Sequence, residues 1–289
     1  MRRLMAASLL AGAAAVAQEP KEPVEALRQR LAERLSTKDA AAATPKAALR
    51  PPARAAKAEP PRPARWGYAG DLGPDRWAEL SPEYRLCGLG TRQSPIDIRE
   101  GLAVDLEPIA FDYRPSGFSV VDTGHTVQVN VAPGNGLTVM GRRYELVEFH
   151  FHRPGEERVN GQQFDMAAHL THRDAQGRLA VLAVLLSRGP DDRPQPVLQS
   201  VWANLPLEKG EAQVAPAPLD LNQMLPADRG YYTYMGSLTT PPCSEGVLWM
   251  VMRQPVLLTA QQIDVFARLY PMNARPLQAG SGRLIKQSQ

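Results

Sequence analysis

Three of the five histidines in this chain, His150, His152 and His169, have the spacing of a catalytic metal site. One residue separates His150 from His152, so in an extended strand both side chains point to the same face. His169 follows 17 residues after His152, far enough for the chain to turn and return on a neighbouring strand. Three neutral imidazoles that converge from one sheet face leave the fourth position of a tetrahedral Zn²⁺ open to water, as in catalytic rather than structural zinc sites.

His172 offers an internal contrast. It lies three residues after His169, so on the same strand it faces the opposite way and should not reach the same metal. We interpret it as a structural histidine. For the other three histidines the alternative is a coincidence of ordinary strand residues, and their shared parity argues against it.

The residues around the histidines predict the elements that must position them. From Trp66 onward the pattern is of short strands, separated by turns rich in Pro and Gly. His125 is expected on a continuous alternating strand over 118–131. Strands are predicted over 118–131, 137–140, 144–152, 165–172, 179–186 and 247–252, and a helix over 260–270 with Thr259 as its N-cap. We therefore expect one domain, 66–289, with a mostly antiparallel sheet and a few peripheral helices.

The first 17 residues have the pattern of a secretory signal peptide. Arg2 and Arg3 precede an apolar run over 4–16, and Ala15-Val16-Ala17 is a small-residue cleavage pattern. A membrane anchor is the weaker alternative, because the run is shorter than the roughly 20 residues that a span needs. We expect a periplasmic or secreted protein that has no transmembrane span after cleavage of residues 1–17.

Residues 18–65 are rich in Ala, Pro and charge, which sets them apart from the rest of the chain. A short helix can form over 22–36, where four apolar residues have helical spacing. Because an isolated helix of that length is marginal in water, it either pairs with a second copy to give a homo-oligomer or belongs to a tether, and we favour the tether. This segment holds eleven Lys/Arg and six Asp/Glu. The basic charge therefore lies in the tether, and the folded part gives no support for nucleic-acid binding.

The chain has two cysteines, Cys87 and Cys243. In an exported protein an even pair suggests one disulfide, with two buried free thiols as the alternative. Neither cysteine has a Cys or His close to it in sequence, so we do not expect either to bind zinc.

Three further segments accompany the histidines: Gln93-Ser94-Pro95-Ile96-Asp97-Ile98, Gly124-His125, and the run SLTTPPCSE over 237–245. Together they resemble the α-class carbonic anhydrases in their secreted bacterial form, and the resemblance extends from Trp66 to Arg283. It implies a mainly β (α+β) single domain on a large, twisted, mostly antiparallel central sheet with short peripheral helices. It also implies a zinc enzyme whose partner is a small molecule, CO₂ or bicarbonate.

The implied reaction is the reversible hydration of CO₂ to bicarbonate and a proton. Zn²⁺ on the three histidines would lower the pKa of bound water to about 7 and supply hydroxide as the nucleophile. Thr239 matches the family threonine that accepts a hydrogen bond from that hydroxide, with its own proton committed to a buried carboxylate. The motif register gives this carboxylate to Glu156, with Glu157 as the rival. His125 matches the family's proton shuttle, and an incidental surface histidine is the alternative.

The resemblance also implies an apolar wall around CO₂. Without the family, four of its residues would simply be interpreted as core: Val181, Leu238, Val247 and Trp249. The residues implied at the substrate are Val181, Leu238, Val247, Trp249, Thr240 and Thr171, the last of which replaces a usual Val.

The supports of the ligands depart from the family pattern. Metal-bound histidines normally donate their second N–H to an outer acceptor. In the family, a carboxylate at the position of Ala167 accepts the outer N–H of the third histidine, here His169. The methyl side chain of Ala167 cannot accept a hydrogen bond. Glu148 stands where the family usually has a neutral Gln that accepts from the first histidine ligand, His150. Asn273 lies in a segment that resembles the one that holds the second ligand, His152. We therefore expect zinc binding to be weakened about tenfold.

Two other functions compete with this one. A carbonic-anhydrase-like binding or scaffolding module, with weak or no activity, usually lacks a zinc histidine, whereas all three are present here. A zinc hydrolase on another scaffold leaves Thr239, Glu156 and His125 unexplained.

Overall fold

The computed structural model describes residues 65–99, 101–190 and 192–289. The predicted signal peptide at 1–17 and the possible oligomerising helix at 22–36 lie outside the described residues, as does all of the tether at 18–65 except Arg65. Within the described residues no helix is both long and apolar enough to span a membrane.

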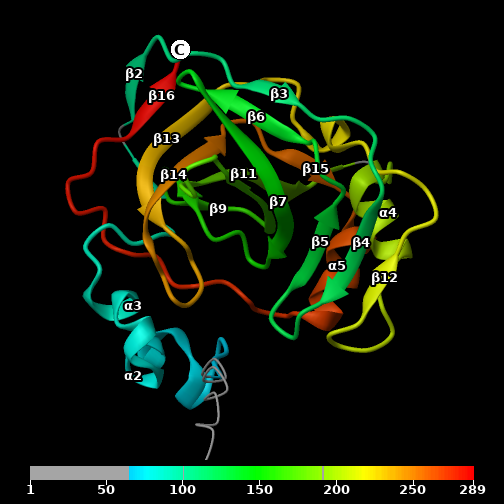
Figure 1. Ribbon diagram of the computed structural model, residues 1–289, viewed down its shortest axis with the longest axis horizontal. Coiled ribbons are helices and arrows are strands. Elements are labelled where there is room, and N and C mark those ends of the chain that lie inside the picture. Colours follow the sequence, from blue (N-terminus) through cyan, green and yellow to red (C-terminus); the bar gives the residue numbers. More distant parts are fainter. Residues whose placement is uncertain (1–64, 100, 191) are drawn as a thin grey trace, which may run out of the picture. The chain divides into compact units, whose positions relative to one another are not determined.

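The described part of the chain is built on one large mixed sheet, which can be followed in Figure 1. In these residues the sheet has 13 strands. Its strands are β2 (Leu102–Val104), β3 (Ala110–Asp112), β4 (Phe118–Asp122), β5 (Val127–Val131), β6 (Gly136–Val139), β7 (Arg142–His152), β10 (Met166–Arg173), β11 (Leu179–Arg188), β12 (Ala212–Val214), β13 (Tyr231–Ser237), β14 (Glu245–Met252), β15 (Val256–Leu258) and β16 (Lys286–Ser288). The main path runs β12-β4-β5-β7-β10-β11-β14-β13-β16-β2. Most neighbours are antiparallel, but β11 and β14 pair in parallel at the centre. The predicted mostly antiparallel sheet is thus confirmed.

The remaining elements are short. A second sheet contains β1 (Asp97–Ile98), β8 (Arg158–Val159) and β9 (Gln162–Gln163). The α-helices are α2 (Trp77–Leu80), α3 (Leu86–Leu89), α4 (Pro196–Ala203) and α5 (Ala260–Leu269), and the 3₁₀ turns are η1 (Gly70–Leu72), η2 (Pro74–Arg76), η3 (Pro82–Tyr84) and η4 (Leu221–Met224). Helices α4 and α5 lie together on one side of the sheet in Figure 1, away from α2 and α3. The predicted Thr259 N-cap of α5 is confirmed, because Thr259 and Gln262 form a reciprocal capping box.

The central strand β11 separates two hydrophobic clusters. Its residues 180–186 are all buried, as expected for a strand that is covered on both faces. Leu182 and Val184 pack in the larger cluster, which includes residues of α4 and α5. Val181 and Ala183 point the other way, into a smaller cluster that contains Trp249. The sheet face on the side of this smaller cluster also carries the histidines.

One strand prediction is wrong in a way that matters for the site. Residues 118–131 form two strands, β4 and β5, joined by a tight turn that contains His125. Gly124 has a φ of 81° and donates to Asp122, while Thr123 accepts from the Thr126 N–H. These turn bonds, typical of Asp and Thr side chains, interrupt the apparent alternation.

The predicted disulfide is confirmed. Cys87 and Cys243 are bonded across a sequence separation of 156 residues. The bond joins α3 to the loop between β13 and β14, which also holds Thr239.

Candidate metal centre and its cavity

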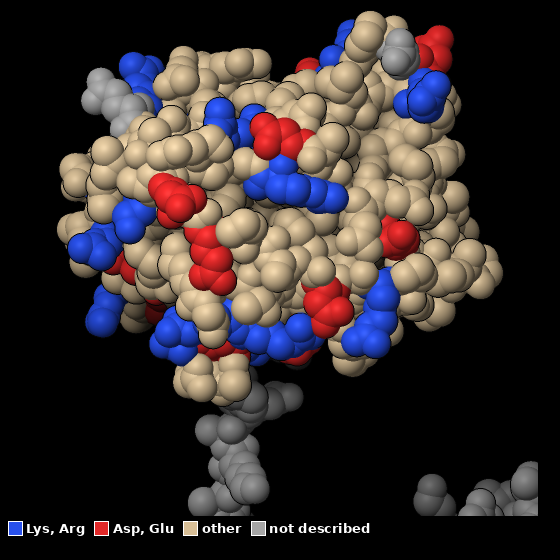
Figure 2. All heavy atoms as spheres, turned by 90° about the horizontal axis from the view of Figure 1, so that it is seen from above, with Lys and Arg blue, Asp and Glu red and all other residues tan. Residues whose placement is uncertain are grey.

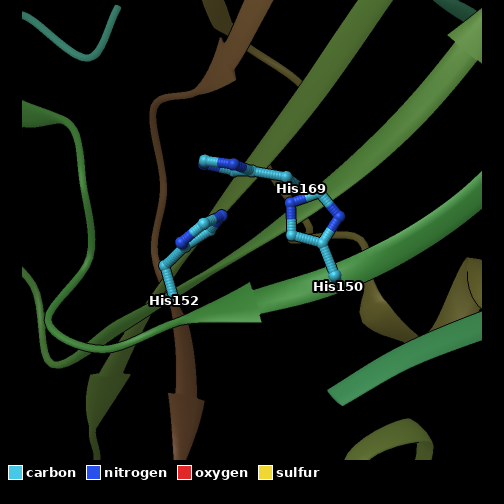
Figure 3. A group of neighbouring side chains, drawn as sticks. All are labelled: His150, His152 and His169. Carbon is cyan, nitrogen blue, oxygen red and sulfur yellow. The ribbon is translucent and has the colours of Figure 1, made fainter. Parts of the chain in front are cut away.

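The three histidines converge as their spacing predicts. His150 and His152 lie on β7, and His169 lies on the neighbouring strand β10 directly opposite His150. Figure 3 shows the three rings turned toward a common point. One potential ligand atom from each ring lies within 4.8 Å of the others. The sheet register alone therefore brings the three imidazoles together.

Each ring is held from outside by an oxygen. His150 Nδ1 lies 2.8 Å from a Glu148 carboxylate oxygen, and His152 Nδ1 donates to the Asn273 carbonyl oxygen at 2.8 Å. His169 Nε2 lies 3.1 Å from Glu157 Oε2. Each ring keeps its second nitrogen for the centre, and His152 Nε2 is buried without a hydrogen-bond partner. Three oriented nitrogen donors, one of them otherwise orphaned, fit a Zn²⁺ ion.

The expectation that His169 lacks an outer acceptor is wrong. Ala167 is buried in the sheet, and its methyl side chain offers no acceptor, as predicted. The acceptor comes instead from Glu157, in the segment that follows β7, and Glu157 is 0 % exposed. The argument for weakened zinc binding therefore loses its premise at this ligand.

The other two unusual residues, Glu148 and Thr171, act on each other. They are cross-strand partners on β7 and β10. Burial opposes ionisation of Glu148, but the His150 ring and the Thr171 hydroxyl hold the pKa of this carboxyl below its usual value. The polar group of Thr171 is therefore engaged by a neighbour, which limits how polar it makes the cavity wall.

Glu156 lies close to two of the ligand rings, 3.5 Å from His152 Nδ1 and 3.8 Å from His169 Nδ1. It is 3 % exposed, and its Oε1 accepts the Arg275 backbone N–H at 2.7 Å. Burial raises the pKa of Glu156 to about 7, while the His169 ring and the Thr239 hydroxyl act to lower it. The hydroxyl beside the Glu156 carboxyl is thus that of Thr239. Glu157, the alternative to Glu156 for this role, contacts His169 instead.

The loop that carries Thr239 is fastened from several sides. Besides the disulfide at Cys243, the Ser94 and Ser237 side chains each accept the other residue's backbone N–H, at 3.2 and 2.9 Å. The buried Arg275 guanidinium donates to the Gln93 side chain and to the Ser94 and Cys87 carbonyls. The sequence analysis did not assign a role to Arg275, although it lies only two residues after Asn273.

Asn273 supports more than one part of the site. Its carbonyl holds His152, and its side-chain amide accepts from the Arg153 N–H at 2.7 Å. The same amide donates to the carbonyls of Phe151 and His125, at 3.0 Å each. Asn273 therefore ties the ligand strand to the turn that carries His125.

A cavity of about 420 Å³ opens above the histidines. Its lining includes His150, His152, Glu148 and Thr171 from the sheet, and Leu238 and Thr240 from the loop after β13. Val181, Val247 and Trp249 are at most 3 % exposed and lie deeper, in the apolar cluster next to the centre. The His169 and Trp249 ring centroids are 5.0 Å apart. The predicted wall residues thus divide between the cavity surface and the layer beneath it.

His125 lies at the mouth of this cavity, half-buried. Its ring stacks on Trp66, with centroids 3.8 Å apart and planes 6° from parallel. Burial and the charge of Lys209 lower its pKa. The sequence offered no sign of the stacking, since Trp66 and His125 are distant in the chain and the turn was predicted as strand.

Val147 also lines the cavity, against the parity of the ligand residues. Thr171 pairs with Glu148 and His172 with Leu146, so Val147 is the extra residue of a β-bulge.

The predicted contrast with His172 is confirmed, because that ring is buried between the Tyr113 hydroxyl and the Leu170 carbonyl. Burial lowers the pKa of His172 to about 4.

Charged side chains do not gather by sign on the face seen in Figure 2, where Lys/Arg and Asp/Glu are interspersed. The prediction that the chain does not bind nucleic acid remains a prediction.

Comparison with known proteins identifies the family. Residues 72–289 match the family model described as eukaryotic-type carbonic anhydrase. A carbonic anhydrase of Nostoc sp. is 41% identical over 226 residues, which cover 76% of this chain and 84% of that protein. A carbonic anhydrase of Pectobacterium carotovorum is 38% identical and is covered over 89% of its length.

Solved structures give the same result. The α-carbonic anhydrase of Thermovibrio ammonificans, in complex with the inhibitor sulfanilamide, has a TM-score of 0.75 at 39% identity, covering 79% of this chain and 100% of its own. A crystal structure of dioscorin complexed with ascorbate has a TM-score of 0.71 at 31% identity, over 77% of this chain and 97% of its own. The chain belongs to the α-class carbonic anhydrases, a family of enzymes that act on CO₂ and bicarbonate.

Proposed function

We propose that this protein catalyses the reversible hydration of CO₂ to bicarbonate and a proton, with Zn²⁺ held by His150, His152 and His169. The observation that carries the proposal is the orientation of the three rings. Each has one nitrogen held by an outer oxygen and the other free for the centre. Bound Zn²⁺ would act as a Lewis acid that makes water a nucleophile near neutral pH.

Thr239 is proposed to orient the ligand at the fourth position. We infer that its proton points to the Glu156 carboxyl, which also accepts the Arg275 N–H and lies 3.5 Å from His152 Nδ1 and 3.8 Å from His169 Nδ1. A hydroxyl whose proton is committed presents only a lone pair. Thr239 would therefore favour ligands that carry a proton and hold them in one direction.

The apolar cluster beside His169 is proposed to receive CO₂. Val181, Val247 and Trp249 belong to this cluster, and Trp249 Nε1 donates to the Ser237 carbonyl at 3.0 Å. CO₂ is small and carries no charge, so it needs no polar partner there. The charged product has no matching group in this cluster, which favours its release.

His125 is proposed to move the proton between the centre and solvent. A proton must leave the site in each hydration cycle, and a half-exposed imidazole at the mouth can take it up and pass it to buffer. Burial and Lys209 lower the pKa of this ring, so it stays neutral, and able to accept, down to a more acidic pH than a free imidazole.

We also propose that the enzyme acts outside the cytoplasm, in the periplasm or after secretion. The signal-like sequence at 1–17 and the Cys87–Cys243 disulfide support this location, since disulfides persist in oxidising compartments. A ligand-binding module is the alternative function, and the fold of dioscorin complexed with ascorbate supports considering it.

The test is stopped-flow CO₂ hydration on protein of measured zinc content, alongside His169→Ala. We expect about one zinc per chain and rapid hydration, both lost in the variant. His172→Gln is the matched control, because it alters a histidine on the same strand that faces away from the centre; it should keep zinc and rate. Full zinc without hydration would contradict the proposal and favour the binding module.

A further inference from the structure

The outer support of His169 comes from an unexpected segment. For His150 the supporting carboxylate is Glu148, two residues earlier on the same strand and 2.8 Å from the ring. The equivalent position before His169 is Ala167, whose side chain has no acceptor atom. The strand that carries His169 therefore cannot orient this ring in the way that β7 orients His150.

Glu157 takes up this task from outside the strand. Its Oε2 lies 3.1 Å from His169 Nε2, and His169 is its only direct hydrogen-bond partner among the described residues. The second oxygen, Oε1, is buried with no partner. Burying a carboxylate is costly unless it is paired, so the contact with His169 is what accounts for its position.

Two consecutive carboxylates, Glu156 and Glu157, lie beside the two nitrogens of the His169 ring. Glu156 Oε2 lies 3.8 Å from His169 Nδ1, on the metal side, whereas Glu157 binds Nε2, on the outer side. The segment is held in place because Arg158 N–H donates to Ile96 and Glu156 accepts from Arg275. This fixed backbone sends successive side chains to opposite sides of the imidazole.

We propose that Glu157 is the positioning residue of the third metal ligand, and that it compensates for Ala167 at the usual place of such a residue on a strand. By accepting from Nε2–H it fixes the tautomer that leaves Nδ1 free to bind the metal, and it fixes the plane of the ring. This assignment rests on the proposed zinc site.

The test measures zinc affinity by chelator competition, with folding checked by circular dichroism. Glu157→Gln keeps the shape and removes the charge, and it should weaken zinc binding about tenfold; Glu157→Ala should weaken it by up to about 10²-fold. The exchange variant Glu157→Ala/Ala167→Glu has the same composition as the natural chain. It should restore affinity to within about threefold, because the carboxylate returns to the ring from position 167.

The control is Asp174→Asn, which neutralises a buried carboxylate that pairs with Arg178 at 2.6 Å and contacts no zinc ligand. The visible spectrum of the Co²⁺-substituted protein provides a second readout. It should change in Glu157→Ala and return in the exchange variant.

Unchanged zinc affinity in both single variants would overturn the assignment. So would equal weakening in Asp174→Asn, or an exchange variant as weak as Glu157→Ala, because the role would then be structural. If the natural chain itself takes up no zinc, the proposed function fails, and this assignment with it. Zinc uptake by the natural chain separates the two failures.

Discussion

The buried floor of the site (His169, Glu156 and Thr239) and its mouth (His125 and Trp66) are built in different ways. The floor side chains are at most 5 % exposed, and sheet register, a disulfide and buried hydrogen bonds fix them. The mouth consists of a four-residue turn that carries His125. The His125 ring is half-buried and stacks on Trp66, near the start of the described residues. Bond-forming chemistry needs fixed geometry, whereas proton relay needs a group that can exchange with solvent.

The largest effect that would test this contrast is expected at the floor. Thr239→Ala removes the hydroxyl beside Glu156 and should lower kcat/KM for CO₂ hydration about 10²–10³-fold, the range for loss of one preorganised polar group. Zinc content should be unchanged, because Thr239 binds no histidine. Ser244→Ala, in the same loop, controls for disturbance of the backbone. A Thr239→Ala enzyme with normal kcat/KM would show that the floor does not orient the reaction.

A smaller and conditional effect is expected at the mouth. His125→Ala should lower kcat about 10²-fold in dilute buffer, since the proton must then leave without a relay. Added imidazole should restore the rate, and interconversion of CO₂ and bicarbonate at chemical equilibrium should be unaffected. If added buffer did not restore the rate, His125 would instead be needed for the geometry of the buried floor residues, and not for proton relay.

The smallest effect concerns the pH profile. Besides burial, Lys209 lowers the pKa of His125, so Lys209→Gln should raise it. The ring accepts a proton only when neutral, and a higher pKa means that it becomes protonated at a higher pH. The acid limb of the kcat profile should therefore move to higher pH, by less than about one unit. A limb that stays in place or moves to lower pH would exclude this ring as the relay.

The same contrast explains what the sequence could predict. Alternation placed His150, His152 and His169 correctly, because strands β7 and β10 are long and each has a period of two. It failed at 123–126, where Asp and Thr side chains bond to the backbone and form a turn within an alternating run. It also gave no warning of the bulge at Val147, which depends on pairing with β10.

The roles of Glu156 and Glu157 show another limit. Adjacent acids in an irregular segment have no period that assigns their directions. Their partners, Arg275 and His169, are 119 and 12 residues away in the chain. The family resemblance chose Glu156 for Thr239 but gave Glu157 no role. Sequence reasoning therefore found the ligands of the centre more readily than the groups that hold them.

Asn273 and Arg275 also set an order of assembly. The carbonyl that fixes His152 is synthesised 121 residues after that ligand, and the N–H that fixes Glu156 is synthesised 119 residues after that carboxylate. While a chain emerges from the ribosome or crosses a membrane, its ligand strands precede the supports that orient them. The proposed metal centre is therefore complete only after the segment at 273–275 has been synthesised and has packed against the ligand strands.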